Sequence, residues 1–300
     1  MSYWTGVLPA VTTKFTSDDR LDIPEMERCF ALQIEAGVHG LIVCGSLGEA
    51  STLEPDEKIE VLKAALRVAD GKVPVLLTVS QGSTRASCKL AEAGAVAGAA
   101  GFMVLPGIPY KSEPHETAAH YRTVAKAGGL PVMIYNNPPA YGVDIPPAML
   151  AELADEPLFT AIKESSDDIR RISEIKSLCG DRFKVLTGVD NLALESLAMG
   201  ADGWVAGLVV AYPRETVAIY ELAKAGRMNE AIAIYRWFRP LLDLDVSARL
   251  VQNIKLVEAL VIGSNDRCRA PRQALQGSER ARLTTIVKAA EATRPTLPSF

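Results

Sequence analysis

The stretch "LPVMIYNNPPAYGVD", from Leu130 to Asp144, carries the pattern on which the fold assignment depends. Its first half is an apolar run without the alternation of a half-exposed strand, and its second half is a turn with two consecutive prolines. A short, uniformly apolar run that ends in a turn is typical of a parallel strand buried on both faces. We therefore predict a buried strand over residues 131–136, followed by a stiff turn.

Similar runs recur along the chain, and amphipathic helical stretches separate them. Residues 23–37 and 55–71, for example, carry apolar side chains at helical spacing and end at a glycine. The apolar runs cover residues 6–12, 40–45, 73–80, 101–107, 131–136, 159–164, 183–188 and 203–207. Eight such units predict a (β/α)8 TIM barrel over residues 1–225. A doubly wound sheet is the alternative, but its G-x-G-x-x-G turn after the first strand is absent.

After Arg227 the apolar runs give way to amphipathic stretches alone. We interpret them as a C-terminal extension of three helices that packs beside the barrel, within residues 226–300. The expected helices cover residues 228–244, 248–263 and 278–292.

Composition narrows the class of function. The 300 residues carry a net charge of −4 and no basic stripe, which argues against nucleic acid or an anionic membrane as a partner. Five scattered cysteines without a C-x-x-C pair, and three histidines, argue against a zinc site and are typical of reduced thiols. The N-terminus lacks the pattern of a signal peptide, and no apolar stretch is long enough to span a bilayer. We expect a cytoplasmic protein with a small-molecule site.

Lys163 is the outstanding candidate for chemistry, because it lies inside the apolar run "FTAIKE" (residues 159–164). Burial disfavours the ammonium form, so the neutral amine becomes a usable nucleophile that forms a Schiff base with a 2-oxo acid. The alternative is a structural ion pair with Glu164 or with another carboxylate at the barrel mouth.

Two further groups are expected at the same end of the barrel. Tyr135 ends the preceding strand, so its phenol is expected beside Lys163, where it could pass protons; the alternative is a half-buried tyrosine at the rim. The turn "GSLG", from Gly45 to Gly48, offers a hydroxyl and a row of backbone N–H groups, which suits a carboxylate. Taken alone, that turn is a weak signal.

At these three motifs the chain resembles the family of Schiff-base aldolases and dehydratases that includes dihydrodipicolinate synthase and N-acetylneuraminate lyase. "GSLGE" resembles its carboxylate-binding turn, "YNNP" its tyrosine motif and "IKES" its Schiff-base lysine strand. The resemblance implies that Lys163 forms the imine and that Tyr135 relays protons. It also implies that Ser46, with the Leu47 backbone, holds the substrate carboxylate and connects its own hydroxyl to the phenol of the relay. It further implies substrate-binding roles for other residues at the barrel mouth, which are Leu47, Gly48, Asn137, Ser165, Gly188 and Val205.

The resemblance also implies a homo-oligomer, a tetramer or a dimer, in which a tyrosine from a neighbouring subunit completes the relay. Tyr110 is the nearest match to that tyrosine. No metal or organic cofactor is implied.

Two departures from the synthase pattern affect the expected substrate. Ala140 stands where the synthase has an arginine for the carboxylate of its second substrate, and Leu47 stands in place of a threonine. The pattern is most similar to the branch that deaminates 1-pyrroline-4-hydroxy-2-carboxylate in hydroxyproline degradation, with release of 2,5-dioxopentanoate and ammonia. The alternatives are dihydrodipicolinate synthase, another 2-oxo acid aldolase or dehydratase of the same family, and a small-molecule sensor that has lost turnover.

Overall fold

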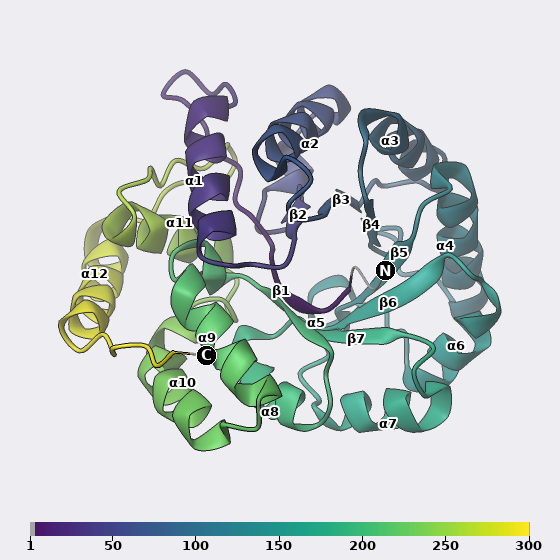
Figure 1. Ribbon diagram of the computed structural model, residues 1–300. Coiled ribbons are helices and arrows are strands. Elements are labelled where there is room, and N and C mark those ends of the chain that lie inside the picture. Colours follow the sequence, from purple (N-terminus) through teal and green to yellow (C-terminus); the bar gives the residue numbers. More distant parts are fainter. Residues whose placement is uncertain (1–3, 300) are drawn as a thin grey trace.

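The computed structural model describes residues 4–299, in which eight parallel strands form one sheet (Figure 1). The strands are β1 (Gly6–Pro9), β2 (Leu41–Val43), β3 (Val75–Val79), β4 (Gly101–Val104), β5 (Val132–Asn136), β6 (Phe159–Glu164), β7 (Lys184–Thr187) and β8 (Gly203–Ala206). From β2 to β8 each strand pairs with the next in sequence, and β1 pairs with β8. Between β1 and β2, a parallel bridge joins Ala10 to Ile42 and closes the ring. The predicted TIM barrel is confirmed, and the doubly wound alternative is wrong.

Helices surround the strands and connect them (Figure 1). The outer helices are α1 (Ile23–Glu35), α2 (Pro55–Ala69), α3 (Thr84–Ala97), α4 (Pro114–Gly128), α6 (Pro147–Glu152), α7 (Arg170–Cys179), α8 (Ala193–Ala198) and α9 (Pro213–Lys224). A short helix, α5 (Pro138–Tyr141), directly follows β5. Single 3₁₀ turns occur at η1 (Ala50–Thr52), η2 (Leu153–Asp155), η3 (Asp190–Leu192) and η4 (Leu208–Val210).

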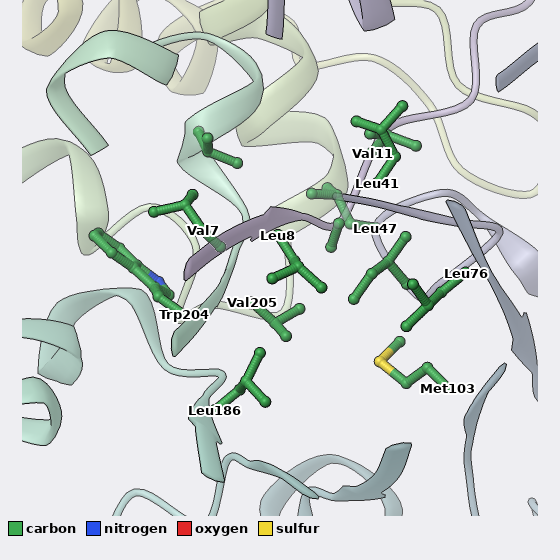
Figure 2. Packing of buried hydrophobic residues seen from close by; sticks show 14 of the residues in the cluster. Val7, Leu8, Val11, Leu41, Leu47, Leu76, Met103, Leu186, Trp204 and Val205 are labelled. Atoms are coloured by element: carbon green, nitrogen blue, oxygen red, sulfur yellow. The ribbon is translucent and has the colours of Figure 1, made fainter. Parts of the chain in front are cut away.

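The strands lack alternation because both of their faces are buried. Leu8, Leu76, Met103, Leu186 and Val205 gather inside the barrel and fill its interior (Figure 2). Their neighbours Val7 and Trp204 point the opposite way, towards the helices (Figure 2). An apolar side chain is therefore required at nearly every strand position, until the strand ends at the barrel mouth.

The C-terminal segment forms the three expected helices, α10 (Met228–Leu242), α11 (Leu250–Val261) and α12 (Gly277–Ala292). α10 packs on the barrel through Phe238, whose ring lies edge-on to that of Tyr212 at 5.4 Å between centroids. α11 is held by Glu258, which pairs with Lys14 at 2.6 Å and accepts a hydrogen bond from Thr12. The extension thus shares the core of the barrel, and the division at residue 225 stays a prediction.

Within residues 4–299, no helix combines the length and the apolar character that crossing a bilayer requires.

Candidate active site

A cavity of about 590 Å³ lies at the carboxyl ends of the strands. This is the end of a TIM barrel at which catalytic groups gather. Most of the predicted site residues line it, namely Ser46, Leu47, Tyr135, Asn137, Lys163, Ser165, Gly188 and Val205.

Lys163 lies at the centre of this group. Its partner in the register between β5 and β6 is Tyr135, and its Nζ lies 4.2 Å from the centre of the Tyr135 ring. The side chain is buried, and burial lowers the pKa of its ammonium group. The amine is thereby prepared to act as a nucleophile near neutral pH.

The alternative of an ion pair between Lys163 and Glu164 is wrong. The Glu164 carboxylate accepts hydrogen bonds from the Asn136 side chain at 3.0 Å and from the Ser166 N–H at 2.7 Å. Lys163 forms no ion pair with any carboxylate of residues 4–299. Alternation along β6 explains the separation, since successive side chains point to opposite faces of a strand.

Tyr135 is a buried phenol whose hydroxyl accepts a hydrogen bond from Asn137 Nδ2 at 3.0 Å. Burial raises its pKa, so the hydroxyl keeps its proton and can donate it. The other end of the Asn137 amide accepts from the Ala140 N–H at 3.1 Å. Both ends of that amide have partners within the chain. Asn137 thus orients Tyr135, and its expected role in substrate binding stays a prediction.

The proline turn after β5 folds as helix α5, with Asn137 as its N-cap and the prolines in its first turn. Gly142 ends the helix in the left-handed region, at φ 70°. This geometry brings the Tyr141 hydroxyl within 2.5 Å of Ser46 Oγ and sets its ring edge-on to Tyr135, 5.5 Å away. Ser46, Tyr141 and Tyr135 thus form an array of hydroxyls beside Lys163.

The turn from Gly45 to Gly48 presents the group that suits a carboxylate. The Ala50 N–H donates to the Gly45 carbonyl, whereas the N–H groups of Ser46 and Leu47 donate to no other residue of 4–299. Free N–H groups at such a turn are ready to bind an anion. Gly48, by contrast, is not among the described residues that line the cavity, and its carbonyl accepts from the Thr13 hydroxyl at 2.7 Å. The Gly48 N–H, like those of Ser46 and Leu47, donates to no other residue of 4–299, so the binding of substrate by Gly48 stays a prediction.

Gly188 makes room for the lysine. A Cβ at this position would lie 2.3 Å from Lys163 Cε and 2.2 Å from Ser165 Oγ, so any side chain here would displace these two groups. The buried hydroxyl of Ser165 has no hydrogen-bond partner within residues 4–299, although it lines the cavity. An unpaired buried hydroxyl is costly, which suits a group that bonds to a ligand.

Sequence reasoning missed the loop between α10 and α11. Asp245, Val246, Ser247 and Ala248 from this loop line the cavity, so the C-terminal extension contributes to the site. Asp245 stands among apolar residues in "LLDLDVS", but nothing in that local pattern indicates a site.

Tyr110 lies outside this cavity. It is 61% exposed on the loop before α4, and its hydroxyl donates to Glu116 of the same chain at 3.0 Å. A contribution of Tyr110 to a neighbouring subunit stays a prediction. Within residues 4–299, no cluster of three or more His, Cys, Asp or Glu side chains is arranged to hold a metal ion.

Comparison with known proteins agrees with this geometry. Residues 3–290 match the family model of the dihydrodipicolinate synthetase family. The 4-hydroxy-tetrahydrodipicolinate synthase of Salinibacter ruber is 39% identical over 211 residues, which is 69% of each chain.

Solved structures agree as well. The crystal structure of dihydrodipicolinate synthase from Thermotoga maritima has a TM-score of 0.91 and 27% identity, over 96% of this chain and 99% of that one. The chloride-inhibited dihydrodipicolinate synthase from Acinetobacter baumannii, solved in complex with pyruvate, has a TM-score of 0.90 and 26% identity over 96% and 99%. None of these relatives carries the name of the expected deaminase. Its fold and its matched residues make this chain a member of the dihydrodipicolinate synthetase family and, with it, a class I aldolase-type lyase.

Proposed function

We propose that Lys163 forms a Schiff base with a small 2-oxo acid or with a cyclic imine derived from one. The substrate carboxylate would bind the N–H groups of Ser46 and Leu47, which have no partner within residues 4–299. Tyr135 would move protons to and from the carbinolamine, since its hydroxyl is oriented by Asn137 and its ring lies against Lys163. Tyr141 would occupy the second place in the relay, from within the same chain, through its hydrogen bond to Ser46.

We propose 1-pyrroline-4-hydroxy-2-carboxylate as the substrate, which the enzyme would dehydrate and deaminate. One observation carries this choice: of the described residues that line the cavity, Lys163 is the sole cation, and the other two ionisable lining residues besides the tyrosines, Asp167 and Asp245, are acidic. Lys163 is consumed by the imine, so a second substrate carboxylate would find no other cation among these lining residues. Ala140, at the lining position beside Pro139, offers no charge. A carboxylate buried without a partner is strongly disfavoured.

The reaction proceeds in steps that these groups can serve. The Lys163 amine adds to C2, the ring carbon of the C=N bond. The ring then opens as the bond between C2 and the ring nitrogen breaks, which leaves the nitrogen as an amine on C5. Loss of a C3 proton gives an enamine, whose electrons expel the C4 hydroxyl as water. Loss of a C5 proton and reprotonation move the unsaturation to the carbon that bears the amine. Hydrolysis of both imines then releases ammonia, 2,5-dioxopentanoate and free Lys163.

The second candidate is 4-hydroxy-tetrahydrodipicolinate synthase, the name that the Salinibacter ruber relative carries. That activity would condense pyruvate with aspartate semialdehyde, whose carboxylate needs a cation in the pocket. The two candidates share Lys163, Tyr135 and the Ser46 turn. They differ only in the part of the pocket that would hold the carboxylate of a second substrate.

A side-by-side assay tests the proposal. One preparation is given the pyrroline, and ammonia is measured; it is then given pyruvate with aspartate semialdehyde, and condensation is measured. We expect ammonia release and negligible condensation. Condensation without ammonia release would establish the synthase in its place. Borohydride trapping with pyruvate, in wild type and in Lys163→Ala, checks the Schiff base that both candidates require.

A further inference from the structure

Asp245 enters the active site from outside the barrel, on the loop between α10 and α11. Its carboxyl group lies over Gly207, just past the end of β8, where a Cβ would stand 2.4 Å from Asp245 Oδ1. Lys163 occupies the corresponding space over Gly188, just past the end of the neighbouring strand β7. The absence of side chains at Gly188 and Gly207, which follow adjacent strands, therefore leaves the space that the lysine and the carboxyl occupy.

This placement puts acidic groups on two sides of Lys163. Tyr135 belongs to β5, on one side of β6, whereas Gly207 and Asp245 lie beyond β7, on the other side. The phenol and the carboxyl therefore face different parts of a substrate attached to Lys163. One group can serve the carbon that bears the imine, and the other can serve atoms further along the substrate.

The surroundings of Asp245 favour a protonated carboxyl. Its neighbour Asp190 is fully buried and accepts hydrogen bonds from Trp204 Nε1 at 2.9 Å and from the Leu208 N–H at 2.8 Å, as well as from the Gly207 N–H. Those donors stabilise the Asp190 carboxylate, whereas no side chain or N–H of residues 4–299 donates to the Asp245 carboxyl. Burial and the charge of Asp190 raise the pKa of Asp245 well above its ordinary value, and they outweigh the opposing charge of Lys163. Asp190 is fully buried and Asp245 is partly buried. When two neighbouring carboxyls repel each other, the one without donors keeps the proton.

We propose that Asp245 is the acid that protonates the departing C4 hydroxyl of the substrate. This assignment rests on the proposed function, because only a hydroxylated substrate has that leaving group. In the step, the nitrogen lone pair of the enamine forms N=C2, the C2=C3 pair moves to C3=C4, and the C4–O bond breaks. The C4 oxygen keeps the bonding pair, takes the proton of Asp245 and leaves as water. Solvent reprotonates the Asp245 carboxylate before the next turnover.

The same residue explains substrate choice. An aspartate semialdehyde at this end of the pocket would bring its carboxylate towards Asp245, which offers no positive charge. A hydroxyl in the same place accepts a hydrogen bond from the protonated acid. Asp245 is therefore a catalytic residue for dehydration, and it supplies no positive charge to neutralise a second anionic group.

The test compares Asp245→Asn with Asp243→Asn. Asp243 is the matched control, because it lies two residues away, is exposed, and accepts a hydrogen bond from Asn191 at 2.8 Å rather than lining the cavity. Each protein is incubated with the pyrroline, and ammonia release is measured. The covalent adduct is then trapped with borohydride and weighed. Trapping with pyruvate, which has no hydroxyl to expel, reports whether Lys163 and the fold are intact.

We expect Asp245→Asn to slow ammonia release by about 10²-fold or more, the usual scale for loss of a general acid. Its trapped adduct should be heavier by one water than that of the control, since dehydration stalls. Pyruvate trapping should match the wild type. Equal ammonia release in the two variants would overturn the role of Asp245 as the acid but leave the proposed function intact. Loss of pyruvate trapping in Asp245→Asn would show that Asp245 supports Lys163 and is not the acid. No ammonia from the wild type would overturn the proposed function and this assignment with it.

Discussion

The substitution Gly188→Ala measures how closely the site is built around Lys163. The new Cβ would lie 2.3 Å from Lys163 Cε, whereas ordinary contacts begin at 3.4 Å. The lysine must therefore retreat by about 1 Å, and a displacement of that size at a reacting group can cost about 10²-fold in rate. The overpacking itself should lower the free energy of unfolding by about 1–3 kcal/mol, too little to unfold a domain of ordinary stability.

The assay follows the rate of borohydride-trapped adduct with pyruvate, which requires only Schiff-base formation. Gly107→Ala is the matched control, because a Cβ at Gly107 would meet no atom within 4 Å and that glycine also follows a barrel strand. We expect trapping to slow by about 10²-fold in Gly188→Ala and to stay unchanged in Gly107→Ala. If the folded Gly188→Ala variant traps pyruvate at the wild-type rate, Lys163 does not need the space beside Gly188 to react.

Three further changes test other parts of the site. Tyr141→Phe should slow turnover by about 10²-fold, whereas Tyr110→Phe should not; the reverse order would assign the relay to a neighbouring subunit. The rate of trapping at Lys163 should rise with pH, because the neutral amine is the form that reacts. Since burial lowers the pKa of Lys163, the midpoint of this rise should lie below 10.5, the ordinary pKa of a lysine; a midpoint at or above that value would contradict the effect of burial. Lys255→Met removes the nearer cation of the fully buried Glu49 carboxylate and leaves only Arg272, at 3.9 Å. Unfolding by urea should therefore show a loss of about 3 kcal/mol in the free energy of unfolding, and a loss below 1 kcal/mol would argue against a buried charge.

The local pattern of the sequence determined the barrel and the lysine. Uniformly apolar runs at regular intervals require strands buried on both faces, and a barrel is the closed form of such a sheet. Within that fold, adjacent strands must pair, so Tyr135 and Lys163 had to become neighbours once both ended a strand. The turn from Gly45 to Gly48 was predicted for the same reason, since strand ends meet at one rim.

The structure alone decided which groups complete the site. Asn137 was predicted to bind the substrate, which stays a prediction; its position as the N-cap of α5 directs its amide to Tyr135 and brings Tyr141 to Ser46. That outcome depends on where the short helix lies against another strand, and no local pattern contains this information.

Asp245 shows the same limit over a longer distance. It lies more than eighty residues after Lys163 in the chain and reaches the cavity only because α10 and α11 pack against the barrel. Its partners are the space over Gly207 and the charge of Asp190, which belong to other strand ends. Periodicity records which side chains face the core, because that depends on neighbours in sequence. The chemistry of a pocket depends on neighbours in space, which only the packing of the whole chain decides.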